Sequence, residues 1–168
     1  MTRKLYLIAI ALIASAYAAT AQPSERLRVL DSLTSALQAS QRNDKKLEIL
    51  NQICDENFNI DTTMKYAEAM RAIAQRSIDK PMEVRALRYL ADCYYNNEEY
   101  GEAMKLLSDE AIPMAQSEKC LEDLGICYVI FGNCASYTKK GTNGNQWYDK
   151  GIDIFRSLGN YKRMIWAF

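Results

Sequence analysis

The chain contains no histidine, and this absence removes several kinds of catalytic and metal-binding site. Ser-His-Asp and Cys-His hydrolases need an imidazole as general base, and many zinc sites need one as ligand. Glycine and proline are scarce, with 7 and 3 residues among 168, so we expect no all-β fold built on tight turns. Basic and acidic residues balance at 21 each, which gives no electrostatic reason to expect nucleic-acid binding.

The longest apolar run lies at the N-terminus and has the features of an export signal. A basic Arg3-Lys4 precedes the run Leu5–Ala14, and Ala19-Thr20-Ala21 follows with the small residues of a cleavage site. The run is shorter than the roughly 20 apolar residues of a membrane-spanning helix. We therefore expect residues 1–21 to be a secretory signal peptide and the mature protein to be periplasmic or secreted. An uncleaved N-terminal anchor is the alternative.

Five cysteines in an exported protein raise the question of disulfides. Cys120, Cys127 and Cys134 are spaced by seven residues, so on a helix they share one face, with neighbours roughly 10 Å apart. A disulfide needs Cα atoms within about 7 Å. We therefore expect buried free thiols and no metal site or other cofactor, unless this segment is not helical.

Apolar residues recur at helical spacing along the whole mature chain, which predicts an all-α protein. We expect a leading helix within residues 22–43 and a repeat domain over residues 44–168. The repeat domain divides into helix pairs at about 44–77, 84–117 and 118–158, and the start of another at 161–168. Pro81 suits the first turn of the second pair, and Pro113 either ends or kinks its second helix.

One helix pair carries a clear repeat. Its alternating large and small positions, separated by a polar turn, are Leu87, Leu90, Ala91, Tyr94, Tyr100, Ala103 and Leu107. The first half of this pattern returns 34 residues later as Leu121, Leu124, Gly125 and Tyr128. A helix pair this small cannot bury its apolar face alone and must stack on copies of itself. The third pair is distended by an insertion around residues 139–145, whose glycines lack the Gly-Lys-Ser/Thr of a phosphate-binding loop.

These residues resemble the tetratricopeptide repeat family, whose helix pairs have a 34-residue period and a loose large–small consensus. The resemblance covers about residues 44–168 and implies an α-solenoid that winds as a right-handed superhelix. The export signal, the leading helix and the irregular pairs also resemble the sensor halves of membrane-bound regulators of Bacteroidetes-type bacteria. In those regulators the repeats precede a membrane helix and an output domain.

The resemblance implies that the first helix of each pair lines a concave, partner-binding groove. Matched by register, the candidate partner-binding residues are Arg85, Arg88, Asp92, Tyr95, Asn96, Lys119, Glu122 and Ile126. Some family members clamp a peptide carboxylate with basic and asparagine residues, but Asp92 stands where an asparagine is needed. We therefore expect no carboxylate clamp.

Two alternatives to this groove remain open. Arg85 and Arg88 could pair with acidic residues of the first repeat, namely Glu48, Asp55 or Glu56. The apolar end of the groove at Ile126 could be covered by the next repeat or by the insertion. Tyr94-Tyr95 and Trp147-Tyr148 are interpreted as packing residues.

The function expected from these observations is a non-catalytic, exported scaffold that binds protein or peptide partners and has a possible sensory role. No carboxylate pair is set apart by its spacing, so we expect no enzyme. The alternative is the N-terminal sensor region of a membrane-bound regulator whose output domain lies beyond Phe168. Apolar residues near the end of the chain also predict self-association through residues 152–168.

Overall fold

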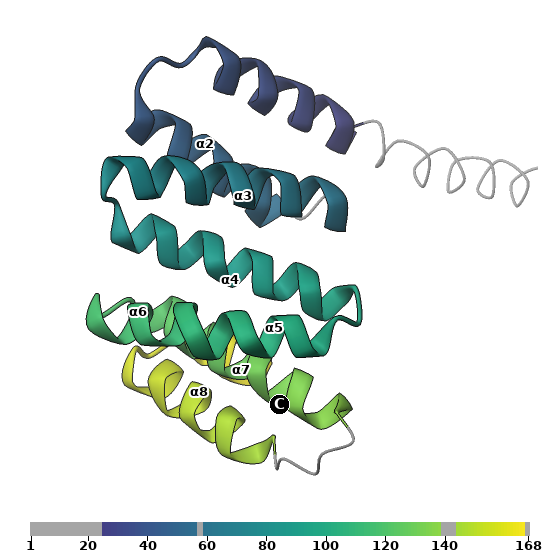
Figure 1. Ribbon diagram of the computed structural model, residues 1–168, viewed down its shortest axis with the longest axis vertical. Coiled ribbons are helices and arrows are strands. Elements are labelled where there is room, and N and C mark those ends of the chain that lie inside the picture. Colours follow the sequence, from purple (N-terminus) through teal and green to yellow (C-terminus); the bar gives the residue numbers. More distant parts are fainter. Residues whose placement is uncertain (1–24, 57–58, 139–143, 167–168) are drawn as a thin grey trace, which may run out of the picture. The chain divides into compact units, whose positions relative to one another are not determined.

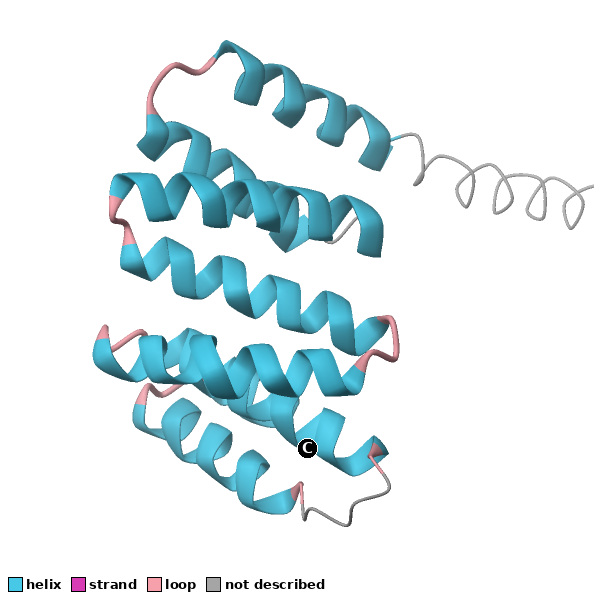
Figure 2. Cartoon of the chain, in the orientation of Figure 1, coloured by secondary structure: helices cyan, strands magenta, loops and turns pink. Residues whose placement is uncertain are grey.

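The computed structural model describes residues 25–56, 59–138 and 144–166, and side chains as far as Met164. The predicted signal peptide lies outside these residues. The chain divides into two compact units, residues 1–39 and residues 40–168. The first unit contributes a helix at residues 25–39. Within the described residues the regular elements of both units are all helical (Figure 2).

The second unit is a stack of helix pairs, as the sequence predicts (Figure 1). Its elements are α2 (Asn43–Glu56), α3 (Ile60–Ser77), α4 (Lys80–Asn96), α5 (Tyr100–Leu106), the π-helical turn η1 (Leu107–Ala111), α6 (Ile112–Ser117), α7 (Leu121–Tyr137), α8 (Asn145–Ser157) and α9 (Tyr161–Trp166). Helices α2, α4 and α7 are the first helices of three successive pairs. Helix α4 packs against α2, α3, α5 and α7, and α7 in turn packs against α8.

Polar side chains fix where the helices begin. The Asn59 side chain accepts a hydrogen bond from the Thr62 backbone N–H at 2.8 Å and caps α3. Asp79 caps α4 by accepting from the Met82 N–H at 3.2 Å, and Pro81 occupies the first turn as predicted. Because of this cap, α4 begins four residues before the predicted start of the second pair at residue 84.

The second helix of the middle pair continues through Pro113. A π-helical turn at Leu107–Ala111 carries it past the proline, and the Ile112 N–H bonds to the Leu107 carbonyl. Proline in a regular helix lacks a hydrogen bond and its ring meets a carbonyl of the preceding turn, and a wider turn relieves that contact. A π-helical turn contains about one residue more than an α-helical turn. This residue places Ala111 at the buried small position and leaves Glu110 partly exposed.

Tight left-handed turns join the stacked helices. Ile78, Glu98, Lys119 and Gly159 have φ of 57°, 62°, 56° and 67°. Only Gly159 is a residue that adopts this conformation without strain, and it follows the end of α8. The 78 % exposed Ile78 side chain is β-branched, so its backbone conformation is the most costly of the four.

Helices α7 and α8 cross closely because glycine lies on both. A Cβ built on Gly125 would lie 2.7 Å from Phe155 Cε1, and one on Gly151 would lie 2.9 Å from Val129 Cγ2. Phe155 is fully buried, and its ring fills the space that a side chain at Gly125 would occupy. The small residues of the repeat pattern are therefore needed because the two backbones approach each other closely.

Candidate partner-binding surface

The first helices α2, α4 and α7 carry a series of polar contacts that link each pair to the next. We call the surface on which these contacts lie the first-helix face. The contacts join residues 34 to 41 positions apart, which is about one repeat. They decide which of the predicted groove residues remain available to a partner.

Arg85 and Arg88 both pair with Asp123 on α7. Arg88 Nε lies 2.7 Å from Asp123 Oδ1, and Arg85 Nη2 lies 3.3 Å from Asp123 Oδ2. Arg88 and Asp123 are only 9 % and 5 % exposed, so this is a buried ion pair at the interface between α4 and α7. The alternative that the two arginines pair with Glu48, Asp55 or Glu56 of the first repeat is wrong, because their ion-pair partner is Asp123 of the third repeat.

Tyr89 links α4 to α2 on the other side. Its hydroxyl donates to the Asp55 carboxylate and lies 3.0 Å from Asn51 Oδ1. The Arg88 guanidinium lies 4.0 Å from the centre of the Tyr89 ring. Burial raises the pKa of the Tyr89 phenol, so this hydroxyl stays protonated and donates at any physiological pH. One connected network therefore runs from α2 through α4 to α7.

The third repeat is joined to α9 in a similar way. Glu122 Oε1 lies 3.4 Å from Arg163 Nε and 3.5 Å from Asn160 Nδ2. Ile126, the predicted apolar end of the groove, is only 3 % exposed. Lys119 lies in the left-handed turn before α7, so it is not on the first helix as its register predicted.

Three tyrosines gather where α4 turns into α5 and where α7 ends. Tyr100 and Tyr137 stack with ring centres 5.1 Å apart and planes within 10°. Tyr95 tilts against both, at 5.9 Å from Tyr100 and 6.2 Å from Tyr137. We call Tyr95, Tyr100 and Tyr137 the tyrosine patch. Tyr137 is 63 % exposed, so the patch faces solvent.

Asp92 and Asn96 lie on α4 beside the tyrosine patch. The Asn96 amide donates to the Asp92 backbone carbonyl at 2.8 Å, and Asn96 is exposed. Asp92 is half-buried, and this burial raises the pKa of its carboxyl group. Within the described part of the chain, Asp92 has no ion pair within 4.0 Å. Of the predicted groove residues, Asp92, Tyr95 and Asn96 are thus brought together at one end of α4.

The opposite side of the stack carries two shallow hollows next to the π-helical turn. One, of about 330 Å³, lies between α3 and α5 and includes Arg71, Gln75 and Tyr94. The other, of about 410 Å³, includes Lys80, Pro113 and Met114. Glu110 lies at the second hollow and forms an ion pair with Arg71 of the first.

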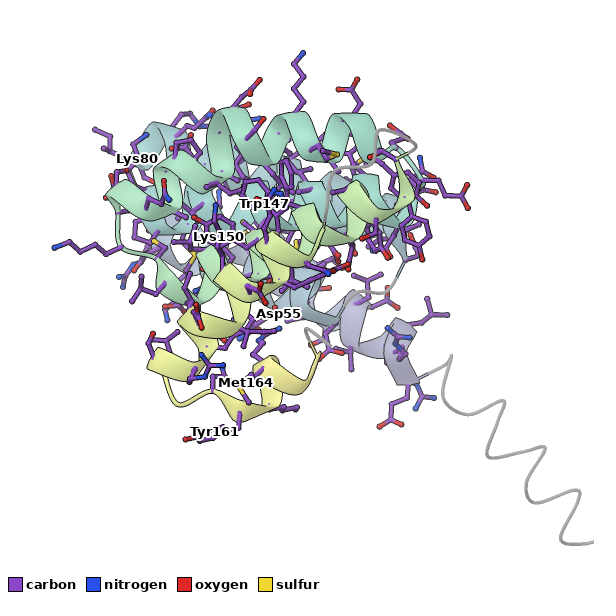
Figure 3. The ribbon with its side chains drawn as sticks, turned by 90° about the horizontal axis from the view of Figure 1, so that it is seen from below. Asp55, Lys80, Trp147, Lys150, Tyr161 and Met164 are labelled. Carbon is purple, nitrogen blue, oxygen red and sulfur yellow. The ribbon has the colours of Figure 1, made fainter. Side chains whose placement is uncertain are left out.

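A second aromatic cluster packs between α7 and α8 and already holds a cation. The Trp147 ring contacts Phe131 at 4.3 Å and Tyr128 at 5.7 Å. Lys150 Nζ lies 4.2 Å from the Trp147 ring centre, and the two residues are neighbours in Figure 3. This cluster fits the interpretation of the sequence aromatics as packing residues.

The cysteines lie in the apolar interior, as expected. All five are free, and four are buried while Cys120 is half-buried. Burial raises the pKa of the Cys54, Cys93, Cys127 and Cys134 thiols to about 12, which makes them poor nucleophiles at neutral pH. Among the described residues no group of histidine, cysteine or carboxylate side chains is arranged to hold a metal ion. None of the described helices has the length and hydropathy that crossing a membrane requires.

Sequence reasoning missed the residues that complete these contacts. Asp123, Tyr89 and Arg163 occupy no position of the tetratricopeptide consensus, and Tyr137 lies at the end of α7 just before the insertion. The sequence carried little signal for Asp123, because it lies beside Glu122 in the first turn of α7, where acidic residues are common. Only the two arginines one repeat earlier hint that this carboxylate has a buried partner.

Comparison with known proteins identifies a family that this chain matches. Residues 20–163 match the family described as the SusR N-terminal TPR domain, a match that spans most of the chain. It supports the predicted α-solenoid class and the predicted resemblance to tetratricopeptide proteins and to Bacteroidetes-type sensors. No curated protein matches the chain.

Proposed function

Because the chain belongs to the family of the SusR N-terminal TPR domain, we propose that it is an exported, non-catalytic scaffold that binds a protein or peptide partner on its first-helix face. Tetratricopeptide domains generally mediate protein–protein interaction, and their all-helical fold is typically non-catalytic. The buried thiols and the ion-paired arginines leave little chemistry on this face beyond binding.

The observation that carries the proposal is the tyrosine patch. Tyrosine is enriched at the energetic centres of protein interfaces because it offers a large, stiff apolar surface with a polar tip. Tyr137 is 63 % exposed. Tyr95 and Tyr100 are partly buried against the core and support Tyr137, and an exposed aromatic ring held by such neighbours is typical of a docking site.

The experiment that tests this proposal has to change exposed side chains and leave the buried contacts in place. Charge reversal at Arg88 would disrupt the buried pair with Asp123 and unfold the interface, so it cannot report on binding alone. Tyr137→Ala together with Asn96→Ala alters exposed side chains of the first-helix face and leaves the core intact. We expect this variant to lose a partner that the parent captures from envelope extract. A matched control, Glu68→Ala on α3, lies on the opposite side of the stack and should retain the partner.

A sensory role in a longer regulator is the second part of the proposal. The matched family is described as the N-terminal domain of SusR, and this favours a chain whose repeats are followed by further domains. Reading the open reading frame beyond Phe168 tests it. A membrane helix and an output domain would support the regulator, whereas an immediate stop codon would support the free-standing scaffold.

Export is proposed from residues 1–21. Mass spectrometry of protein recovered from the cell envelope should give a mature N-terminus at Gln22. Recovery of a chain that begins at Met1 in the cytosolic fraction would contradict export, and recovery of that chain in the membrane would support the uncleaved anchor.

Self-association through residues 152–168 is proposed from exposed apolar side chains near the last helices. Leu158 is 44 % exposed, and Tyr161 is 65 % exposed and projects from α9 in Figure 3. Sedimentation velocity should show an association that increases with concentration and that Leu158→Glu abolishes. A monomer at all concentrations would refute this part of the proposal.

A further inference from the structure

We propose that the tyrosine patch and Asp92 form a binding site for a lysine or arginine side chain of the partner protein. This inference rests on the proposed function, because it names the chemistry of the partner at the same face. It is carried by the geometry of the rings, by a carboxylate beside them that has no ion pair among the described residues, and by a comparison within the chain.

The rings of the patch present π faces to a ligand. In the stacked pair Tyr100–Tyr137, each ring covers only one face of the other, and Tyr137 is largely exposed. A lysine ammonium or arginine guanidinium is attracted to such a face within about 6 Å of the ring centre. The stacking also holds the rings in place, so a partner does not have to order them on binding.

The carboxylate of Asp92 supplies complementary charge. Arg88, four residues earlier on α4, acts electrostatically on Asp92, and the Asn96 side chain hydrogen-bonds to it. The ion pair of Arg88 is with Asp123 at 2.7 Å, so among the described side chains Asp92 has no ion pair within 4.0 Å. A half-buried carboxylate gains more from an incoming cation than an exposed one, because less water screens the interaction. Glu98, in the turn between α4 and α5, acts electrostatically on Tyr100 and adds negative charge at the rim.

Other aromatic side chains of this protein have a lysine or arginine next to the ring. Lys150 lies over Trp147 and, at 5.4 Å, over Tyr128, and Arg88 lies over Tyr89. Lys65 lies 5.1 Å from the Tyr66 ring. Within the described residues no lysine or arginine takes such a position over Tyr95, Tyr100 or Tyr137. In the described part of the chain the patch is thus a cluster of electron-rich rings with no cation over them, and we assign that place to a side chain of the partner.

The site carries negative charge, whereas a carboxylate clamp carries positive charge. A clamp needs an asparagine and cations at this part of the first helix to hold an acidic chain end. Here Asp92 replaces the asparagine, and Arg85 and Arg88 are turned into the interface with α7. These changes disfavour an anionic ligand and favour a cationic one.

Two matched peptides test the inference on the purified protein. The first is acetyl-Gly-Lys-Gly-amide, and the second replaces lysine with norleucine, which has a similar chain and no charge. We expect the lysine peptide to shift the NMR signals of the Tyr95, Tyr100 and Tyr137 rings in a saturable way. The norleucine peptide should bind at least about tenfold more weakly. Equal binding of the two peptides, or shifts confined to other residues, would overturn the site.

Variants separate the contributions of the carboxylate and the rings. Asp92→Asn and Tyr137→Leu should each weaken binding of the lysine peptide at least about fivefold, whereas Tyr137→Phe keeps the π face and should bind like the parent. Tyr161→Leu, which removes an exposed tyrosine on α9, is the control and should leave binding unchanged. Circular dichroism of each variant confirms folding, and Tyr137 is exposed enough for its variants to remain folded. Unchanged binding in Tyr137→Leu and Asp92→Asn would refute the inference.

The outcome also distinguishes this inference from the proposed function. If the captured partner depends on Tyr137 and Asn96 but lysine and norleucine peptides bind equally, the inference fails and the scaffold function stands. If no partner depends on the first-helix face, the proposed function fails whatever the peptides do.

Discussion

Among single residues, Asp123 has the largest electrostatic role between α4 and α7. Its carboxylate is the partner of both Arg85 and Arg88, and its replacement by alanine would leave the buried Arg88 charge without a counter-ion. We expect Asp123→Ala to lower the free energy of unfolding by about 3–5 kcal/mol. Its neighbour Glu122 makes an exposed pair with Arg163, and Glu122→Ala should cost less than about 1 kcal/mol. Urea unfolding measures both, and equal losses would contradict a buried role for Asp123.

Gly125 tests the close crossing of α7 and α8. A methyl group at this position would meet the Phe155 ring, which is buried and has little room to move. We expect Gly125→Ala to destabilise the protein by about 1–3 kcal/mol in thermal unfolding. Gly101→Ala on α5 is the control, since a Cβ there meets nothing within 4 Å, and it should stabilise by about 0.5 kcal/mol. A Gly125→Ala variant as stable as its parent would show that the helices are farther apart.

Asp92 should make stability depend on pH in a defined direction. Burial raises the pKa of this carboxyl group above its value of 3.8 in the unfolded chain, so the folded state disfavours the ionised form. This penalty is absent below the unfolded pKa and complete above the folded pKa. Asp92→Asn removes it, so the variant should gain stability relative to the parent between pH 4 and pH 7. Urea unfolding at the two pH values measures the gain, and a relative loss at pH 7 would show that a cation already pairs with Asp92.

The positions of the groove residues could be predicted only in part at this scale. The register placed Tyr95, Asp92 and Asn96 correctly on one stretch of α4. It could not show that Arg88 is buried, because a side chain on a first helix can turn either toward the groove or toward the next repeat. That choice depends on Asp123, which lies 35 residues away in the sequence.

Among the elements, the left-handed turns offer the clearest prediction. Ile78 and Gly159 occupy equivalent turns with φ of 57° and 67°. A non-glycine residue in this region costs about 1–2 kcal/mol, less the entropy that glycine loses on folding. We expect Ile78→Gly to stabilise by about 0.5–1 kcal/mol and Gly159→Ala to destabilise by about 1 kcal/mol in thermal unfolding. Stabilisation by Gly159→Ala would contradict the turn geometry.

Most helix positions follow from local sequence, whereas the course of one second helix does not. Asn59, Asp79 and Gly159 mark ends that local capping rules recognise. Pro113 is compatible with either a helix end or a continuation, and the π-helical turn decides in favour of continuation. Leu107 and Ala111 of that turn are buried in the core, and the repeat pattern marks Leu107 but not Ala111.

On the scale of the whole molecule, the stacking of pairs could be read from the 34-residue repeat because no pair buries its apolar face alone. The binding surface could not be read in the same way. The repeat pattern describes residues that pack, whereas the tyrosine patch joins the ends of α4 and α7 with the start of α5. Such a surface exists only after the repeats are assembled.

The most direct test of a scaffold that binds through its first-helix face is quantitative capture from envelope extract. The parent protein, the Tyr137→Ala/Asn96→Ala variant and the Glu68→Ala control are immobilised at equal density, and the bound proteins are quantified by mass spectrometry. We predict a partner that the parent and the control bind equally and that the first-helix variant loses at least about tenfold. Identical capture by all three proteins, or loss of the partner only with the Glu68→Ala control, would contradict the account.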